Sequence, residues 1–96
     1  MVTVGLLVTM TAKPGKEQEL AAFLRDAVEV ARAEPDTAAW FALSLGDMTF
    51  GVFEAFTGQA GRQTHLRAAQ ALAAQAEHLL ASTPEITPVD VLAAKL

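Results

Sequence analysis

The chain has 96 residues, of which 52% are hydrophobic and 19% are charged, and its formal net charge is -4. This length has room for one domain, residues 1–96, and so high a share of apolar residues predicts that a second copy of the chain covers part of its surface. The basic residues are scattered, which excludes a surface that tracks the phosphates of nucleic acid. Without cysteine there is no disulfide, no thiolate metal site and no cysteine nucleophile.

The apolar N-terminal segment is too short to cross a membrane, a task that takes about 20 consecutive apolar residues. It has no basic leader and turns polar at Thr9, Thr11 and Lys13, so it resembles a strand more than a signal peptide. We therefore expect a cytoplasmic protein that has no membrane partner.

The first third of the chain predicts a strand followed by a helix. Residues 3–11 alternate between apolar and polar side chains, and Leu7 makes the strand apolar on parts of both faces. Pro14-Gly15 ends this strand. From residue 16 the apolar residues recur at helical spacing, which predicts a helix up to about residue 34, before Pro35.

The middle of the chain predicts a hairpin. Residues 37–45 alternate as a strand that places Trp40 and Phe41 on opposite faces. Gly46-Asp47 is typical of a tight turn, and residues 48–56 form the returning strand.

A second helix and a last strand complete the predicted order. Thr57 is a suitable N-cap, and an apolar stripe with His65 in it continues to Leu79. Residues 82–84 break the helix, and residues 86–94 alternate as a final strand. The order βαββαβ predicts a ferredoxin-like α+β fold, a four-stranded antiparallel sheet with both helices on one face.

Two helices cover only one face of such a sheet, whereas the first three strands are apolar on both. We therefore expect the uncovered faces of two copies to stack, which forms a homodimeric α+β barrel. Each subunit would keep a cavity between its sheet and its helices.

His65 and Glu54 are the candidate catalytic residues. His65 shares the apolar stripe of the second helix, which turns it toward the end of the third strand. Glu54 interrupts the apolar alternation of that strand. If the two side chains meet, the carboxylate could orient the ring for proton transfer. The alternatives are a structural histidine bonded to a backbone carbonyl, and a carboxylate that reaches solvent or pairs with an arginine.

Three aromatic residues, Trp40, Phe53 and Phe56, are candidates for binding a flat aromatic ligand. His78, Arg62 and Arg67 lie off the apolar stripe of the second helix and are expected in solvent. The glycines form no nucleotide-binding loop, and two distant histidines without cysteine form no metal site, so we expect neither cofactor nor metal.

These residues resemble the antibiotic biosynthesis monooxygenase domain family, whose members are small dimeric α+β barrels. The resemblance rests on residues 53–57 followed by His65-Leu66, on the turn at residues 13–16 and on the Glu34-Pro35 turn, and it covers nearly the whole chain. It implies oxygenation of quinols or anthrone-like aromatic molecules without metal or flavin. By this resemblance His65 would act as the base or hold the phenolate, Glu54 would orient it, and the three aromatic residues would line the pocket.

The chain departs from the family pattern at several positions. Phe56 stands where many members have tryptophan, and Gln70 stands where some have a second histidine. The chain has neither asparagine nor tyrosine. Some relatives degrade haem with the help of an asparagine, so this activity is disfavoured. The anthrone oxygenases polarise their substrate with asparagine and tyrosine side chains, and this chain has no residue for that role. Two other interpretations therefore stay open: a non-catalytic ligand-binding or stress-response dimer, and an isomerase-like proton-transfer enzyme.

Overall fold

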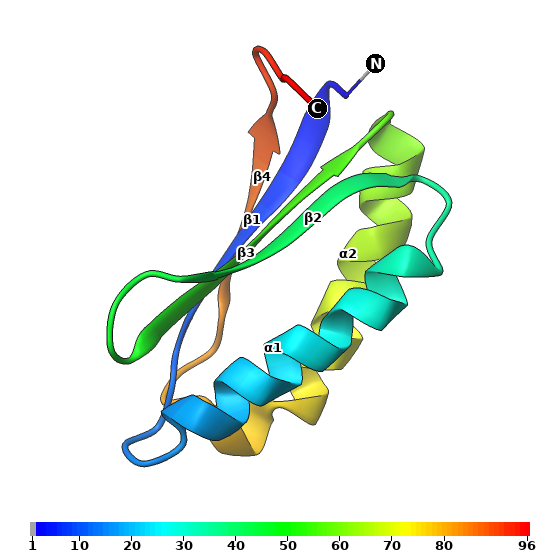
Figure 1. Ribbon diagram of the computed structural model, residues 1–96. Coiled ribbons are helices and arrows are strands. Elements are labelled where there is room, and N and C mark those ends of the chain that lie inside the picture. The colour runs from blue at the N-terminus through cyan, green and yellow to red at the C-terminus, as the bar shows by residue number, and fades with distance from the viewer. Residues whose placement is uncertain (1) are drawn as a thin grey trace.

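The computed structural model describes residues 2–96, which form four strands, two helices and one short 3-10 turn (Figure 1). The elements follow the chain in this order: β1 (Val4–Thr11), α1 (Glu17–Arg32), β2 (Thr37–Ser44), β3 (Thr49–Phe56), α2 (Gln59–Gln75), η1 (Glu77–Leu79) and β4 (Glu85–Asp90). The predicted βαββαβ order is confirmed.

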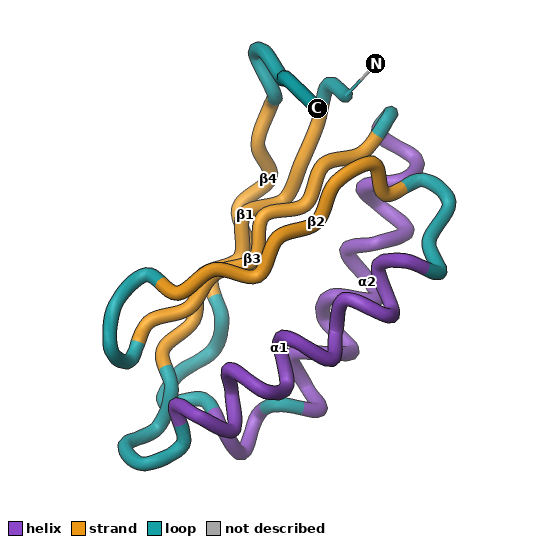
Figure 2. The backbone as a smooth tube through the Cα atoms, viewed as in Figure 1, coloured by secondary structure: helices purple, strands orange, loops and turns teal. Residues whose placement is uncertain are grey.

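The four strands form one antiparallel sheet in the order β2-β3-β1-β4. Both helices lie on the same side of this sheet, as Figure 2 shows by the separation of purple helices from orange strands. The ferredoxin-like α+β architecture that the sequence predicts is therefore present. None of the helices in residues 2–96 has the length and apolar character that a membrane crossing requires.

Local sequence explains how β1 passes into α1. Gly15 adopts φ +82°, a left-handed conformation that glycine takes without steric cost, so the chain can reverse directly after β1. Glu17 and Glu19 lie in the first turn of α1 and Arg32 lies in its last turn, where each charge complements the helix dipole. Leucines 20 and 24 then place the apolar face of the helix on the sheet.

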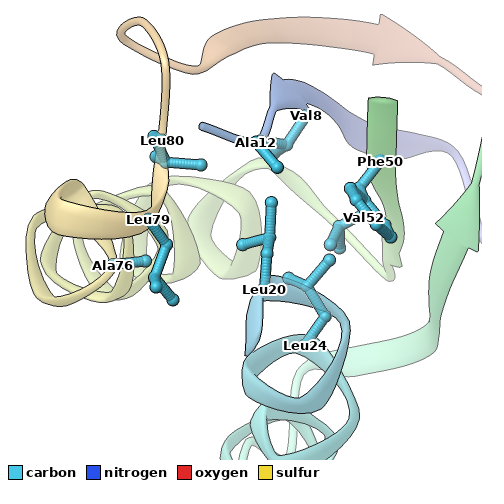
Figure 3. Packing of buried hydrophobic residues seen from close by; sticks show 9 residues of the cluster. All are labelled: Val8, Ala12, Leu20, Leu24, Phe50, Val52, Ala76, Leu79 and Leu80. Carbon is cyan, nitrogen blue, oxygen red and sulfur yellow. The ribbon is translucent and has the colours of Figure 1, made fainter. Parts of the chain in front are cut away.

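The main core lies between the sheet and the two helices. Figure 3 shows its buried side chains converging from β1 and the residue after it, from α1 and β3, and from the segment after α2 that contains η1. The members of this cluster are Val8, Ala12, Leu20, Leu24, Phe50, Val52, Ala76, Leu79 and Leu80. A second, smaller cluster of Val4, Leu6 and Phe56 lies near the opposite end of the sheet and supports the first turns of α2.

Three local predictions were wrong. The N-cap of α2 is Gly58, not Thr57, and no side chain caps the helix. The last strand ends at Asp90, so residues 91–94 lie beyond it. Arg62 is half-buried rather than solvated, because its guanidinium donates hydrogen bonds to the Val89 carbonyl at 3.2 Å and to Gln59 Oε1 at 2.7 Å. This arginine ties α2 to β4.

The sheet face opposite the helices is apolar and largely uncovered. Phe41 and Leu43 are 51% and 38% exposed, and Phe41 pairs with the half-buried Phe53, which in turn pairs with Leu7. Directly paired residues share a face, so these side chains form one continuous apolar surface, which we call the open sheet face. Its presence agrees with the sequence-based expectation that several strands are apolar on both sides.

Candidate active site

Glu54 and His65 meet in the interior, on the helix-covered side of the sheet. Glu54 is 2% exposed and His65 is 3% exposed, and Glu54 Oε2 lies 2.5 Å from His65 Nε2. Although the two atoms are this close, Oε2 accepts no hydrogen bond of regular geometry from residues 2–96. The carboxylate is therefore not in solvent, and within residues 2–96 His65 makes no hydrogen bond to a backbone carbonyl.

Two further side chains fix the imidazole. The ring of Phe56 lies 5.3 Å from that of His65, centroid to centroid, at an interplanar angle of 41°. The Thr37 hydroxyl lies 3.5 Å from the second ring nitrogen, Nδ1. Both ring nitrogens therefore have a polar neighbour, and a flat apolar surface limits rotation of the ring.

Thr37 was not among the residues that the sequence indicated. In a regular strand it would share a face with Ala39 and Phe41, on the side away from the helices. The register of β2 against β3 shifts between Thr37 and Ala39, and Thr37 pairs with Phe56. This irregularity turns the hydroxyl toward His65. A bulge of this kind leaves no reliable mark in a single sequence.

A small cavity borders the carboxylate. It measures about 50 Å³ and lies between the sheet and the two helices, with Glu54 and Trp40 on its wall. Its other lining residues are Val8, Met10, Phe23, Leu24, Ala27, Val52, Ala69, Leu72, Ala73, Ala76, Leu80 and Pro84. Among residues 2–96, Glu54 is therefore the only charged residue that lines it. His65 is not on the wall and lies behind Glu54.

The three predicted aromatic residues are not brought together. Trp40 pairs with Glu54 and lines the cavity, as expected for that face of β2. Phe56 is fully buried and packs against His65 instead of the cavity. Phe53 lies on the open sheet face, because neighbouring residues of a strand point to opposite sides. The expectation that Phe53 shares a pocket with Trp40 was wrong.

The remaining titratable groups stay apart from this site. His78 is exposed, in agreement with the sequence-based expectation. Within residues 2–96, no three histidine, cysteine, aspartate or glutamate side chains gather in a way that could hold a metal ion. The chemistry available at the cavity is proton transfer by the Glu54–His65 pair in apolar surroundings.

Comparison with solved structures places this arrangement among known folds. NE2512, a protein of unknown function from Nitrosomonas europaea, is 53% identical, and the match has a TM-score of 0.93 and covers 100% of this chain and 95% of that one. The chain belongs to the same family as NE2512. No family model and no curated protein matches the sequence.

Less similar solved structures show which known fold this protein shares. PA3566 from Pseudomonas aeruginosa is 25% identical at a TM-score of 0.74, and the match covers 97% of each chain. A candidate antibiotic biosynthesis monooxygenase from Nitrosomonas europaea is 17% identical at a TM-score of 0.80, with 94% of this chain and 90% of that one covered. The fold is therefore antibiotic biosynthesis monooxygenase-like, as the sequence resemblance predicts.

Proposed function

We propose that this protein is a cofactor-independent monooxygenase that acts on a small electron-rich aromatic molecule, such as a quinol or an anthrone-like compound. The observation that carries the proposal is the buried Glu54–His65 pair, whose carboxylate borders an apolar cavity. The similarity of fold to candidate antibiotic biosynthesis monooxygenases supports the same class.

The pair would act on the substrate as a base. Glu54 would accept the proton of an acidic O–H or C–H group, since its carboxylate is the member that lines the cavity. His65 would hold the carboxylate in place from behind, and Thr37 and Phe56 would hold the imidazole. This division of roles reverses the one that the family resemblance implies, in which the histidine faces the substrate.

Deprotonation prepares the substrate for oxygen. The carbanion or phenolate is a better reductant than its neutral form and can pass an electron to O2. For an anthrone-like substrate, a ring CH2 group and O2 give a carbonyl group and one water, so four electrons leave the carbon and four reduce the oxygen. No external reductant is needed. An apolar cavity would favour this step, because it keeps bulk water from the reactive anion.

The test is oxygen uptake with a panel of quinols and anthrones in air-saturated buffer. We expect protein-dependent uptake for the wild type and a loss of about 10² to 10⁴-fold for Glu54→Gln, the range typical of removing a general base. His78→Gln changes the exposed histidine and serves as the control. No uptake above autoxidation, or an undiminished rate for Glu54→Gln, would refute the proposal.

A non-catalytic ligand-binding protein is the second candidate. It is favoured by the composition of the cavity wall. Of the described residues that line it, Glu54 alone is acidic or basic, and none has a hydroxyl or amide side chain that could polarise a substrate. In this case an aromatic ligand would bind to the wild type and to Glu54→Gln alike, and neither protein would consume oxygen.

We further propose that the protein forms a homodimer through the open sheet face. The exposed Phe41 and Leu43 belong to a continuous apolar surface that a second copy could cover. Light scattering should then give twice the monomer mass of 10.1 kDa, and Phe41→Glu should give the monomer. Gln63→Glu, an exposed position on α2, is the matched control. A wild type of monomer mass at low micromolar concentration would refute this proposal.

A further inference from the structure

The cavity beside Glu54 has a larger neighbour. A groove of about 670 Å³ runs along the C-terminal half of α2, past η1 and the loop before β4. Ala73, Leu80 and Pro84 line both the groove and the inner cavity, so these three residues form the wall between the two spaces. The inner cavity therefore has a neighbouring space that opens to solvent and lies one side chain away.

The two spaces differ in the size of the molecule that each can hold. The inner cavity, at about 50 Å³, is well below the roughly 150 Å³ of an engineered protein cavity that takes up benzene. The groove lies within the range of about 300 to 1,000 Å³ that small-molecule sites occupy. An aromatic substrate could not lie wholly beside Glu54 without displacing part of the wall.

The chemistry of the two spaces also differs. The inner cavity is apolar apart from Glu54, whereas the groove presents Lys13, Gln70, Glu77 and Thr83, all of them exposed. Hydrogen-bonding groups on a ligand would lose their water partners in the inner cavity but could exchange them for side chains in the groove. The two spaces together suit a molecule with one apolar end and one polar end.

Of the three wall residues, Leu80 is the one whose side chain has alternative rotamers. It follows η1 directly, in extended backbone, and its side chain is 6% exposed. A leucine side chain can change rotamer without a change of backbone, whereas Ala73 has no such freedom and Pro84 has a closed ring. A shift of Leu80 would join the groove to the inner cavity.

We propose that the groove is the outer half of the same binding site. The ligand is an aromatic molecule with one apolar end and one polar end: its reactive ring passes Leu80 to reach Glu54, and its polar end stays in the groove. This inference rests on the proposed function in one respect only, that the ring of the ligand reacts at Glu54. Binding of the molecule can be tested without any turnover.

The first test blocks the groove from the surface of α2. Ala74 lines the groove, whereas Ala71, exposed on the same helix, lines neither space, so Ala74→Phe and Ala71→Phe form a matched pair. The probe is anthraquinone-2-carboxylate, and its binding is followed by quenching of Trp40, the single tryptophan, which lines the inner cavity. We expect Ala74→Phe to raise the Kd of the probe about tenfold or more, because the added ring would fill part of the groove that the probe occupies. Ala71→Phe should leave the Kd unchanged.

The second test opens the wall. Leu79 and Leu80 are similarly buried, at 4% and 6% exposed, and are neighbours in the core (Figure 3), but only Leu80 borders the two spaces. Leu80→Ala should speed association of the probe, and Leu79→Ala should not.

Equal affinity of the Ala74→Phe protein and the wild type, or an absence of quenching in the wild type, would overturn the inference. Unchanged association after Leu80→Ala would overturn the role of that side chain. Groove-dependent binding without oxygen uptake would instead count against the proposed function and leave the groove as a ligand site.

Discussion

Removing His65 should expose how strongly the buried pair is coupled. In His65→Leu the carboxylate of Glu54 stays 2% exposed but loses the ring nitrogen that lies 2.5 Å from its Oε2. Deleting the partner of a buried carboxylate costs about 3 to 5 kcal/mol, because the remaining negative charge is neither hydrated nor compensated. A domain of this size has a total stability of about 5 to 15 kcal/mol, so the variant should be close to the limit of folding.

The opposite deletion should cost less. In Glu54→Leu the imidazole keeps its neighbour Thr37, and an uncharged ring needs no counter-ion. We expect a loss of about 1 to 3 kcal/mol, the usual range for one unsatisfied buried polar group. The double variant Glu54→Leu/His65→Leu removes both polar groups at once. It should be more stable than His65→Leu alone, since no buried charge remains.

The assay is urea unfolding at pH 7, followed by far-UV circular dichroism, for the wild type and the three variants. The protein concentration must be equal throughout, because self-association would add to apparent stability. With a slope of about 1 to 3 kcal/mol per molar urea, the His65→Leu midpoint should fall by at least about 1 M. If the two single losses add to the double loss within about 0.5 kcal/mol, the side chains are not coupled and the reasoning is wrong.

Three further predictions concern the surroundings of this pair. Thr37→Val should alter the nitrogen-15 shifts of the His65 ring, and Thr37→Ser should restore them; identical shifts in all three proteins would exclude the hydroxyl as a partner. Gly5→Ala should lower stability by about 1 to 3 kcal/mol in urea unfolding, because the added Cβ would meet a backbone carbonyl of β3; wild-type stability would contradict this close approach. Arg62→Leu should speed hydrogen exchange near Val89 at the end of β4, since two hydrogen bonds are lost, and unchanged exchange there would show that the arginine does not secure this edge.

Much of the fold could be predicted from periodicity. The alternation in residues 3–11 and the helical spacing from residue 16 identify β1 and α1 because each pattern reflects which side is buried. The ends of elements were less predictable. Thr57 is a good N-cap by residue type, yet the chain enters α2 one residue later, where Gly58 occupies the cap in extended backbone. Terminal positions depend on packing at the end of the sheet as much as on local preference.

The candidate site was predictable in part. The stripe of α2 indicates that His65 faces the sheet, and the alternation of β3 indicates that Glu54 faces the helices. The same alternation separates Phe53 from Glu54, so a strict application of the two-residue period would have excluded it from the pocket. The sequence could not predict whether Glu54 or His65 borders the cavity. The answer depends on how deeply each side chain lies between β3 and α2, and this depth is set by packing between separate elements.

The sequence by itself determined the order of elements and the sidedness of β3 and α2, which turns Glu54 and His65 toward the same layer; that the two side chains meet comes from the structure. The order and the sidedness follow from periods of 2 and 3.6 residues, which are properties of the local backbone. Only the tertiary structure decided that Thr37 completes the site, because a register shift in β2 turns it to the helix side. It also decided that Glu54, not His65, lies on the cavity wall, and that Leu80 separates this cavity from the groove. Register and depth arise from contacts between distant segments, which the local pattern of a single chain does not encode.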